Sequence, residues 1–341
     1  MLIELLDILE HELGDSLSQS GVKIRPPLSS IKTSNNDLAS RKINFLVFNH
    51  RERQPILVLR LAQGDEQKSF LKNEYETLSQ LVKYPAIAGA MPLPLGLFEF
   101  KNNLIAVENC LSGVSLFTLL RRGKHTHPFW VKRDFRLACD FLSELERVTT
   151  DGYTPFPDSN TVQSKLDQLS FTYAPLNIPK DYEKQLLEIA DEHRSLMIMR
   201  CGRQGDYWPG NLLLSPKGIG VIDWEGFAHP DLLFLDIFFF MTTYVLFYPW
   251  YAWKSCPTEK AFGLGFIEEN WLSTIIKETL ELFFLKINVP PPAMYLLFNL
   301  FLMDMSLPSA ITNDPRDPPQ YFKWFNMFQT LIQSKSPFLA R

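Results

Sequence analysis

The stretch from Gln204 to Glu225, QGDYWPGNLLLSPKGIGVIDWE, constrains the fold of this chain more than any other part of the sequence. Two apolar runs flank the turn-forming residues Ser215–Gly218, a pattern that predicts a β-hairpin. If the strands pair symmetrically about that turn, Asn211 begins one strand and Asp223 directly follows the other. The sequence therefore predicts two oxygen-bearing side chains at the same end of a hairpin.

These two side chains form a candidate Mg²⁺ site, because Mg²⁺ is bound by one or two protein oxygens together with substrate phosphates. Asp206 lies five residues before Asn211 on an irregular segment, where its carboxylate can face an incoming hydroxyl group. The alternative is that Asp206, Asn211 and Asp223 are solvated polar residues of a surface hairpin without a functional role. The spacing, the turn residues and the apolar flanks all favour the metal-site interpretation.

The spacing Asp-x-x-x-x-Asn, with a further Asp after the hairpin, resembles the catalytic loop and metal-binding Asp of protein kinases. The variant here, Gly-Asp-x-x-x-x-Asn followed by Ile-Asp-Trp-Glu, is similar to the aminoglycoside phosphotransferase and choline kinase branch of that superfamily. The resemblance implies that Asp206 orients or deprotonates an acceptor hydroxyl, while Asn211 and Asp223 hold Mg²⁺ for ATP. Gln204 stands where this family usually has His, and we expect Gln204 to brace the loop by different hydrogen bonds.

The same resemblance implies the two-lobed α+β fold of the protein-kinase-like enzymes, with a small antiparallel sheet in the N-terminal lobe and a larger helical C-terminal lobe. We expect a nucleotide-binding lobe over residues 1–110 and a lobe with the catalytic loop and acceptor pocket over 111–341. The sequence has no Walker A motif, which excludes the P-loop proteins. Ile-Asp-Trp-Glu replaces Asp-Phe-Gly, and no Ala-Pro-Glu element follows, which disfavours the protein kinases.

An ion pair is expected in the first lobe. Arg60 lies in a predicted strand, 56–62, with apolar residues on both sides, and a charge in such a place needs a partner. Glu74 lies on the apolar stripe of a predicted helix, 69–83. The resemblance assigns Arg60 and Glu74 to the Lys–Glu pair that binds the ATP phosphates, with Arg replacing Lys. The alternative is an ordinary strand-edge Arg and a solvated Glu.

The other nucleotide contacts have weaker signals. No glycine lies in the loop where a kinase would bind phosphates, so Ser40 and Asn44 are the candidates there. The polar segment 28–42 is equally well explained as a solvated loop. After a predicted strand at 104–108, the resemblance places the hinge between the lobes, where backbone groups near Glu108 and Cys110 would bind adenine.

Helical patterns dominate the rest of the chain. An amphipathic helix is expected at the N-terminus, through Leu13, whereas the segment 149–179 contains four prolines and is expected to be turn-rich. Further helices are predicted over 114–122, 128–148, 180–196, 266–287, 293–305 and 321–333.

The run from Leu232 to Trp253 has 22 residues with Asp236 as its only charge, so its length alone makes it a transmembrane candidate. Asp236, Pro249 and several Tyr and Thr residues favour a buried core helix instead. In the resembling family this helix opens with an Asp and a hydrophobic residue, and either Asp231-Leu232 or Asp236-Ile237 fits.

Charge and cysteine content restrict the partners and the compartment. The net charge of −4 argues against nucleic acid as the main partner. Four cysteines without a Cys-x-x-Cys pair fit a reducing compartment, so we expect a cytoplasmic protein. From His229 to the end, ten acidic and eight basic residues occur among many aromatic ones. This predicts a neutral or singly charged hydroxyl acceptor, such as a sugar or an amino alcohol, over a polycationic aminoglycoside.

Two other functions stay open. Gln204, Arg60 and the missing glycines are compatible with a pseudokinase that binds nucleotide, or nothing, and acts as an interaction module. The aromatic run after Leu232 is compatible with contact to a membrane.

Overall fold

The computed structural model describes residues 2–11, 17, 21–33, 42–174, 176–232, 234–248, 257–307 and 320–334. The chain divides into two compact units. Unit 1 comprises Met1–Val114 and Leu213–Phe227, and unit 2 comprises Ser115–Leu212 and Ala228–Arg341.

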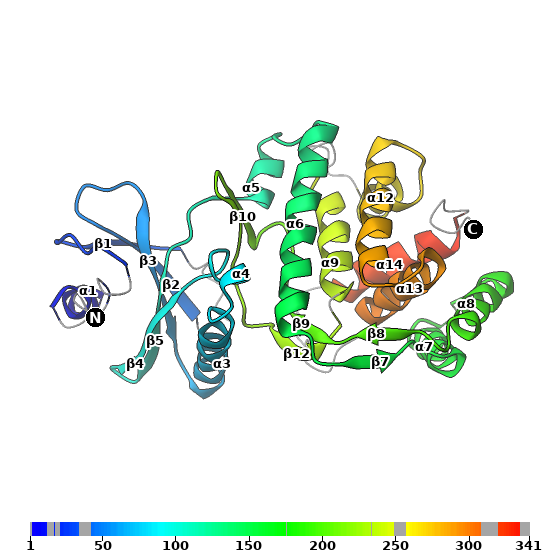
Figure 1. Ribbon diagram of the computed structural model, residues 1–341, viewed down its shortest axis with the longest axis horizontal. Coiled ribbons are helices and arrows are strands. Elements are labelled where there is room, and N and C mark those ends of the chain that lie inside the picture. The colour runs from blue at the N-terminus through cyan, green and yellow to red at the C-terminus, as the bar shows by residue number, and fades with distance from the viewer. Residues whose placement is uncertain are drawn as a thin grey trace. The chain divides into compact units, whose positions relative to one another are not determined.

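Unit 1 is built on a five-stranded antiparallel sheet in the order β1-β2-β3-β5-β4 (Figure 1). The strands are β1 (Ser29–Lys32), β2 (Lys42–Phe48), β3 (Pro55–Ala62), β4 (Pro94–Phe100) and β5 (Asn103–Asn109). The helices of unit 1 are α1 (Leu2–His11), α3 (Asp65–Leu81) and the short α4 (Pro85–Ala88).

The two faces of this sheet pack against different elements, because successive side chains of a strand point to opposite faces. Leu57, Leu59 and Leu61 of β3 form the main core of the unit, against the apolar side of α1. Ala62, on the other face, packs with Leu71 of α3. The face under α3 also carries Arg60, so the charged residue of β3 lies apart from the leucine core.

Two strands of this sheet were not expected. β4 begins at a proline, which is unfavourable inside a sheet, but β4 is an edge strand, where a missing backbone N–H breaks no ladder bond. β1 lies in the polar segment that was expected to be a loop. As the other edge strand it is largely exposed, and it therefore lacks the apolar alternation that identifies a strand in a sequence.

The predicted hairpin is confirmed as β10 (Leu212–Ser215) and β11 (Gly218–Val221), and β10 also pairs with β6 (Val114–Ser115). The N–H of Val221 donates to the carbonyl of Ala90 at 2.7 Å, which fastens the hairpin to unit 1. The expected division into residues 1–110 and 111–341 differs from the structure in this segment, since Leu213–Phe227 belongs to the first unit.

Unit 2 is mainly helical, which together with the antiparallel sheet of unit 1 confirms the α+β class. Its short strands form two pairs, β7 (Tyr153–Pro155) with β8 (Met197–Met199) and β9 (Cys201–Arg203) with β12 (Ala228–Asp231). Its helices are α5 (Leu116–Arg121), α6 (Pro128–Thr149), α7 (Ser159–Thr172), α8 (Lys180–Glu192), α9 (Phe234–Leu246), α11 (Thr258–Phe266), α12 (Trp271–Lys286), α13 (Pro291–Ser306) and α14 (Gln320–Ile332).

The aromatic run after Leu232 forms α9, a buried helix as predicted. The Phe238 ring is fully buried, and its centroid lies 5.1 Å from the rings of Phe284 and Phe298. Among the helices in the described ranges, none is long and apolar enough to cross a membrane. Residues 249–253 of the run lie outside the described residues.

Two helix predictions in unit 2 were wrong. The segment 149–179 contains α7, which starts where the Asp158 side chain accepts the N–H of Thr161 at 2.9 Å. The helix predicted over 266–287 begins later, at Trp271 as α12, because Asn270 caps its start in a capping box with Ser273. In both places the local capping hydrogen bond, rather than apolar periodicity, sets the boundary.

Glu146, a buried residue of α6, should make the free energy of unfolding depend on pH. Burial raises the pKa of Glu146 from 4.5 to about 7, because it disfavours the charged carboxylate. Between these pH values the folded protein keeps a proton that the unfolded chain has lost, so the free energy of unfolding falls as pH rises. We predict that Glu146→Gln raises the free energy of unfolding by about 1 kcal/mol at pH 8, and by progressively less toward pH 4.5.

Thermal denaturation at a series of pH values measures this difference. Glu144→Gln is the matched control, because Glu144 lies on the same helix and pairs with Arg147 at an exposed position. An advantage of Glu146→Gln that stays constant with pH would contradict the prediction.

Candidate active site

Unit 2 contains the segment predicted as the catalytic loop, between β9 and β10. The Nδ2 group of Asn211 donates to the carbonyl of Asp206 at 3.0 Å and to its carboxylate Oδ2 at 2.8 Å. Two of the three residues that carry the sequence motif are therefore in direct contact. Because Asn211 donates through Nδ2, its side-chain oxygen remains the acceptor that can face a cation.

Gln204 braces this loop as predicted. Its side chain is fully buried, and its Oε1 accepts the N–H of Asp206 at 2.7 Å. The side-chain amide thus fixes the backbone immediately before the Asp206 carboxylate.

Asp236 anchors the same loop from the first turn of α9. Its two carboxylate oxygens accept the N–H groups of Gln204 at 2.6 Å and Gly205 at 3.0 Å. Burial raises the pKa of Asp236 to about 7, although Arg203 and the two N–H donors act in the opposite direction. Asp231 instead pairs with Arg203 at 2.8 Å, so the Asp236-Ile237 pair, and not Asp231-Leu232, opens the buried helix.

A cavity of about 540 Å³ lies beside Asp206, within unit 2. Helices α9, α11, α13 and α14 contribute to its lining, together with Trp208 from the catalytic loop. The Asp206 carboxylate therefore has access to a space large enough for a small molecule.

Unit 1 contains a charged cluster around Arg60. The Nη1 atom of Arg60 lies 3.0 Å from Glu74 Oε1 and 3.6 Å from Asp223 Oδ1. The expected ion pair between Arg60 and Glu74 is thus present, and both side chains are largely buried. The N–H of Trp224 donates to Glu74 at 3.1 Å, so helix α3 and the segment after β11 are joined at this point. Asp223 adopts a left-handed backbone conformation, with φ of 63°, as the chain leaves the hairpin.

Glu108 joins the cluster through its side chain, whereas the sequence suggested only a backbone role near it. Its Oε1 lies 3.2 Å from Arg60 Nε. Burial raises the pKa of Glu108 to about 7; Arg60 opposes this shift, and Glu74 and Asp223 add to it. The N–H of Cys110 donates to the Ile56 carbonyl at 2.9 Å, so this group is already bonded and adenine would need other backbone groups of the segment.

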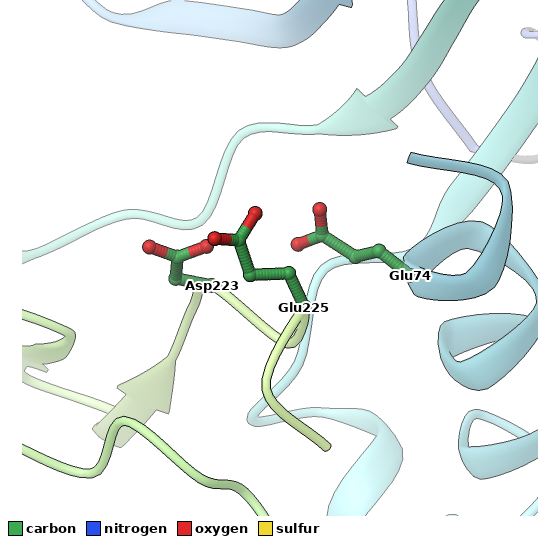
Figure 2. A group of neighbouring side chains, drawn as sticks. All are labelled: Glu74, Asp223 and Glu225. Carbon is green, nitrogen blue, oxygen red and sulfur yellow. The ribbon is translucent and has the colours of Figure 1, made fainter. Parts of the chain in front are cut away.

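Glu225 is a further candidate site residue that was not predicted from the sequence. The carboxylates of Glu74, Asp223 and Glu225 each place an oxygen within 4.8 Å of the other two (Figure 2). Figure 2 shows Glu225 beside Asp223, with Glu74 facing them from α3. The sequence feature that could have identified Glu225 is its place as the final residue of the Ile-Asp-Trp-Glu motif.

This group of oxygen donors fits Mg²⁺. The hard carboxylate oxygens are the ligand type that Mg²⁺ prefers, and Asp223 and Glu225 are both accessible to solvent. Glu74, Asp223 and Glu225 bring three carboxylates together at one place, which suits a divalent cation.

Asn44 lies on β2 directly opposite Arg60 of β3. Its Oδ1 atom is buried and has no hydrogen-bond partner among the described residues. Ser40, the other residue suggested for phosphate, lies outside the described residues. The contacts of Asn44 and Ser40 with phosphate stay predictions.

Solved phosphotransferase structures resemble this chain. APH(3'')-Id from Streptomyces rimosus, in complex with ADP and streptomycin, has 14% sequence identity, a TM-score of 0.41, and an alignment over 84% of this chain and 98% of that chain. A choline/ethanolamine kinase family protein from Mesorhizobium loti has 12% identity and a TM-score of 0.37, over 91% of this chain and 89% of that one. No curated protein sequence matches significantly.

Comparison with protein families identifies the family of this chain. The phosphotransferase enzyme family matches residues 43–271, which is more than half of the chain, and includes Arg60, Glu74 and the whole motif from Gln204 to Glu225. This match confirms the resemblance inferred from the motif. The chain belongs to the phosphotransferase enzyme family.

Proposed function

We propose that this protein transfers the γ-phosphoryl group of ATP to a hydroxyl group of a small molecule. The setting of Asp206 carries the proposal. Asp206 lines the cavity of about 540 Å³, while Asn211 and Gln204 hold its side chain and its backbone. A carboxylate fixed at the wall of a ligand-sized cavity is suited to receive or orient the proton of a hydroxyl group.

In the proposed step, one bond to the γ-phosphorus forms as another breaks. The acceptor oxygen bonds to the γ-phosphorus, the bond from that phosphorus to the β,γ-bridging oxygen breaks, and ADP leaves. Asp206 takes the hydroxyl proton and later releases it to solvent. Because the protein forms no covalent intermediate in such a step, its contribution is to position the reactants and stabilise charge.

Asn211 and Asp223 are the residues that would hold Mg²⁺, following the family motif, and Glu225 is a third candidate from the geometry of unit 1. Bound Mg²⁺ would neutralise phosphate charge and orient the γ-phosphate. Arg60, kept in place by Glu74 and Glu108, would contact the phosphates as the Lys of a kinase does. Ser40 and Asn44 would add phosphate contacts, and the segment from Glu108 to Cys110 would bind adenine.

The acceptor would be a neutral or singly charged hydroxyl compound, a class for which sugars and amino alcohols were the examples suggested by composition. Among the described residues that line the cavity, Asp206 is the only acidic one. A polycationic aminoglycoside would need several carboxylates for its charges, and the described lining supplies one.

The second candidate is a nucleotide-binding protein without transfer activity. Arg60 favours it, because Glu74, Glu108 and Asp223 already engage the guanidinium. Incubating the purified protein with Mg²⁺–ATP and a panel of hydroxyl compounds, and measuring ADP release, separates the two. Acceptor-dependent ADP release supports the kinase, and its absence across a panel that includes sugars, amino alcohols and hydroxy acids supports the second candidate.

The first prediction from this proposal concerns Asp206. We predict that Asp206→Asn lowers kcat by about 10²-fold or more, because the amide cannot accept the hydroxyl proton. Mg²⁺–ATP binding should change little. Asp191→Asn, at an exposed position of α8, is the control and should keep full activity. Transfer at the normal rate by Asp206→Asn would remove Asp206 from the catalytic role.

The second prediction concerns the metal. We predict that Asp223→Ala abolishes Mg²⁺-dependent ATP binding, whereas Glu225→Gln weakens it by about tenfold, because an amide oxygen is a poorer ligand than a carboxylate. Calorimetric titration of ATP with and without Mg²⁺ measures both effects. Equal ATP affinity of the unaltered protein in the two conditions would show that the metal assignment is wrong.

A further inference from the structure

We infer that the acceptor is an apolar hydroxyl compound with one anionic group, and that Lys323 binds this group in the cavity beside Asp206. This inference rests on the proposed function, because it identifies the substrate class of the same site. It follows from the size, the lining and the charges of the cavity, all of which belong to unit 2.

The lining of the cavity requires an apolar ligand body. Eight of the twelve residues that line it are apolar. Two aromatic pairs contribute to the wall: the ring centroids of Trp208 and Phe247 lie 5.7 Å apart, and the rings of Phe239 and Trp324 stack at 5.8 Å. The volume of about 540 Å³ is within the range of sites for small organic ligands. Burial of apolar ligand surface against these rings would be the main source of affinity.

A sugar fits this lining poorly. Besides Asp206 and Lys323, the polar side chains among the described lining residues are those of Thr243 and Thr258. The Thr243 hydroxyl already donates to the Phe239 carbonyl at 2.6 Å. The ring hydroxyls of a sugar would lose water without finding enough partners, and each unsatisfied polar group is costly.

The charged residues of the cavity indicate the charge of the acceptor. Among the described residues that line the cavity, Asp206 and Lys323 are the charged ones. The proposed reaction already places the acceptor hydroxyl at Asp206, so Lys323, on the first turn of α14, is available to the rest of the molecule. An ammonium group there would be repelled, and a carboxylate or phosphate would be attracted.

The rival ligand is an amino alcohol whose cationic end lies on the aromatic rings. Aromatic faces do attract cations. The cavity differs from such a site because its second charged residue is a lysine and not another carboxylate. A direct comparison of ligands that differ only in this charged group therefore decides between the two.

The test uses three alcohols with one apolar body: biphenyl-4-methanol, and its 4'-carboxylate and 4'-aminomethyl derivatives. Quenching of tryptophan fluorescence, without ATP, measures binding to the whole protein, since Trp208 and Trp324 line the cavity. We expect the carboxylate to bind at least about tenfold more tightly than the amine, with the neutral alcohol between them. Lys323→Met should remove this preference, and Lys323→Glu should reverse it.

Lys260→Met is the matched control, because Lys260 is exposed on the neighbouring helix α11 and does not line the cavity. It should keep the preference for the carboxylate. Tighter or equal binding of the amine, a preference that survives Lys323→Met, or no binding of any of the three alcohols would overturn the inference. Because binding is measured without nucleotide, a preference without phosphoryl transfer would count against the proposed function and leave the ligand class standing.

Discussion

The structure of unit 1 depends on one buried guanidinium. Arg60 of β3 contacts Glu74 of α3, Glu108 of β5 and Asp223 after β11, so three elements meet at this side chain. Burial alone would lower the pKa of Arg60, but the carboxylates of Glu108, Glu74 and Asp223 outweigh it and raise the pKa above its usual value. Arg60 therefore stays charged, and its removal would leave buried carboxylates without a counter-ion, which costs far more than an exposed ion pair is worth.

The catalytic loop of unit 2 is also held by buried polar side chains, here through hydrogen bonds to its backbone. Asp236 accepts two backbone N–H groups and Gln204 accepts a third, so the backbone before Asp206 has its donors satisfied inside the protein. A loop that is fixed in this way can keep a carboxylate in place without help from a ligand. This is the condition for catalysis by positioning, because the cost of ordering the group is met during folding.

The sequence revealed those residues whose chemistry depends on spacing along the chain. Asp206, Asn211 and the hairpin follow from local pattern, and the Arg60–Glu74 pair follows from a charge in an apolar strand and a charge on an apolar stripe. The side chain of Glu108 could not be predicted in the cluster, because only the pairing of β3 with β5 brings it to Arg60. Glu225 was missed for a related reason, since its closeness to Glu74 depends on where α3 meets the segment after β11. The edge strands β1 and β4 lack a pattern of their own and depend on their neighbours.

The candidate sites of the two units differ in their charge. Unit 1 gathers Arg60 and several carboxylates around the residues assigned to the nucleotide, where phosphates and a divalent cation need opposite charges at close range. The described lining of the cavity in unit 2 carries two charges, Asp206 and Lys323, among aromatic and aliphatic side chains. Phosphoryl transfer needs the same nucleotide chemistry for every acceptor, so the charged cluster has little freedom to vary. In the proposed function the acceptor would contact the cavity wall instead, and discrimination there would depend on apolar contact and on the sign of a single charge. If Lys323 binds the acceptor as proposed, its replacement would change which molecule is phosphorylated more than how the phosphoryl group moves.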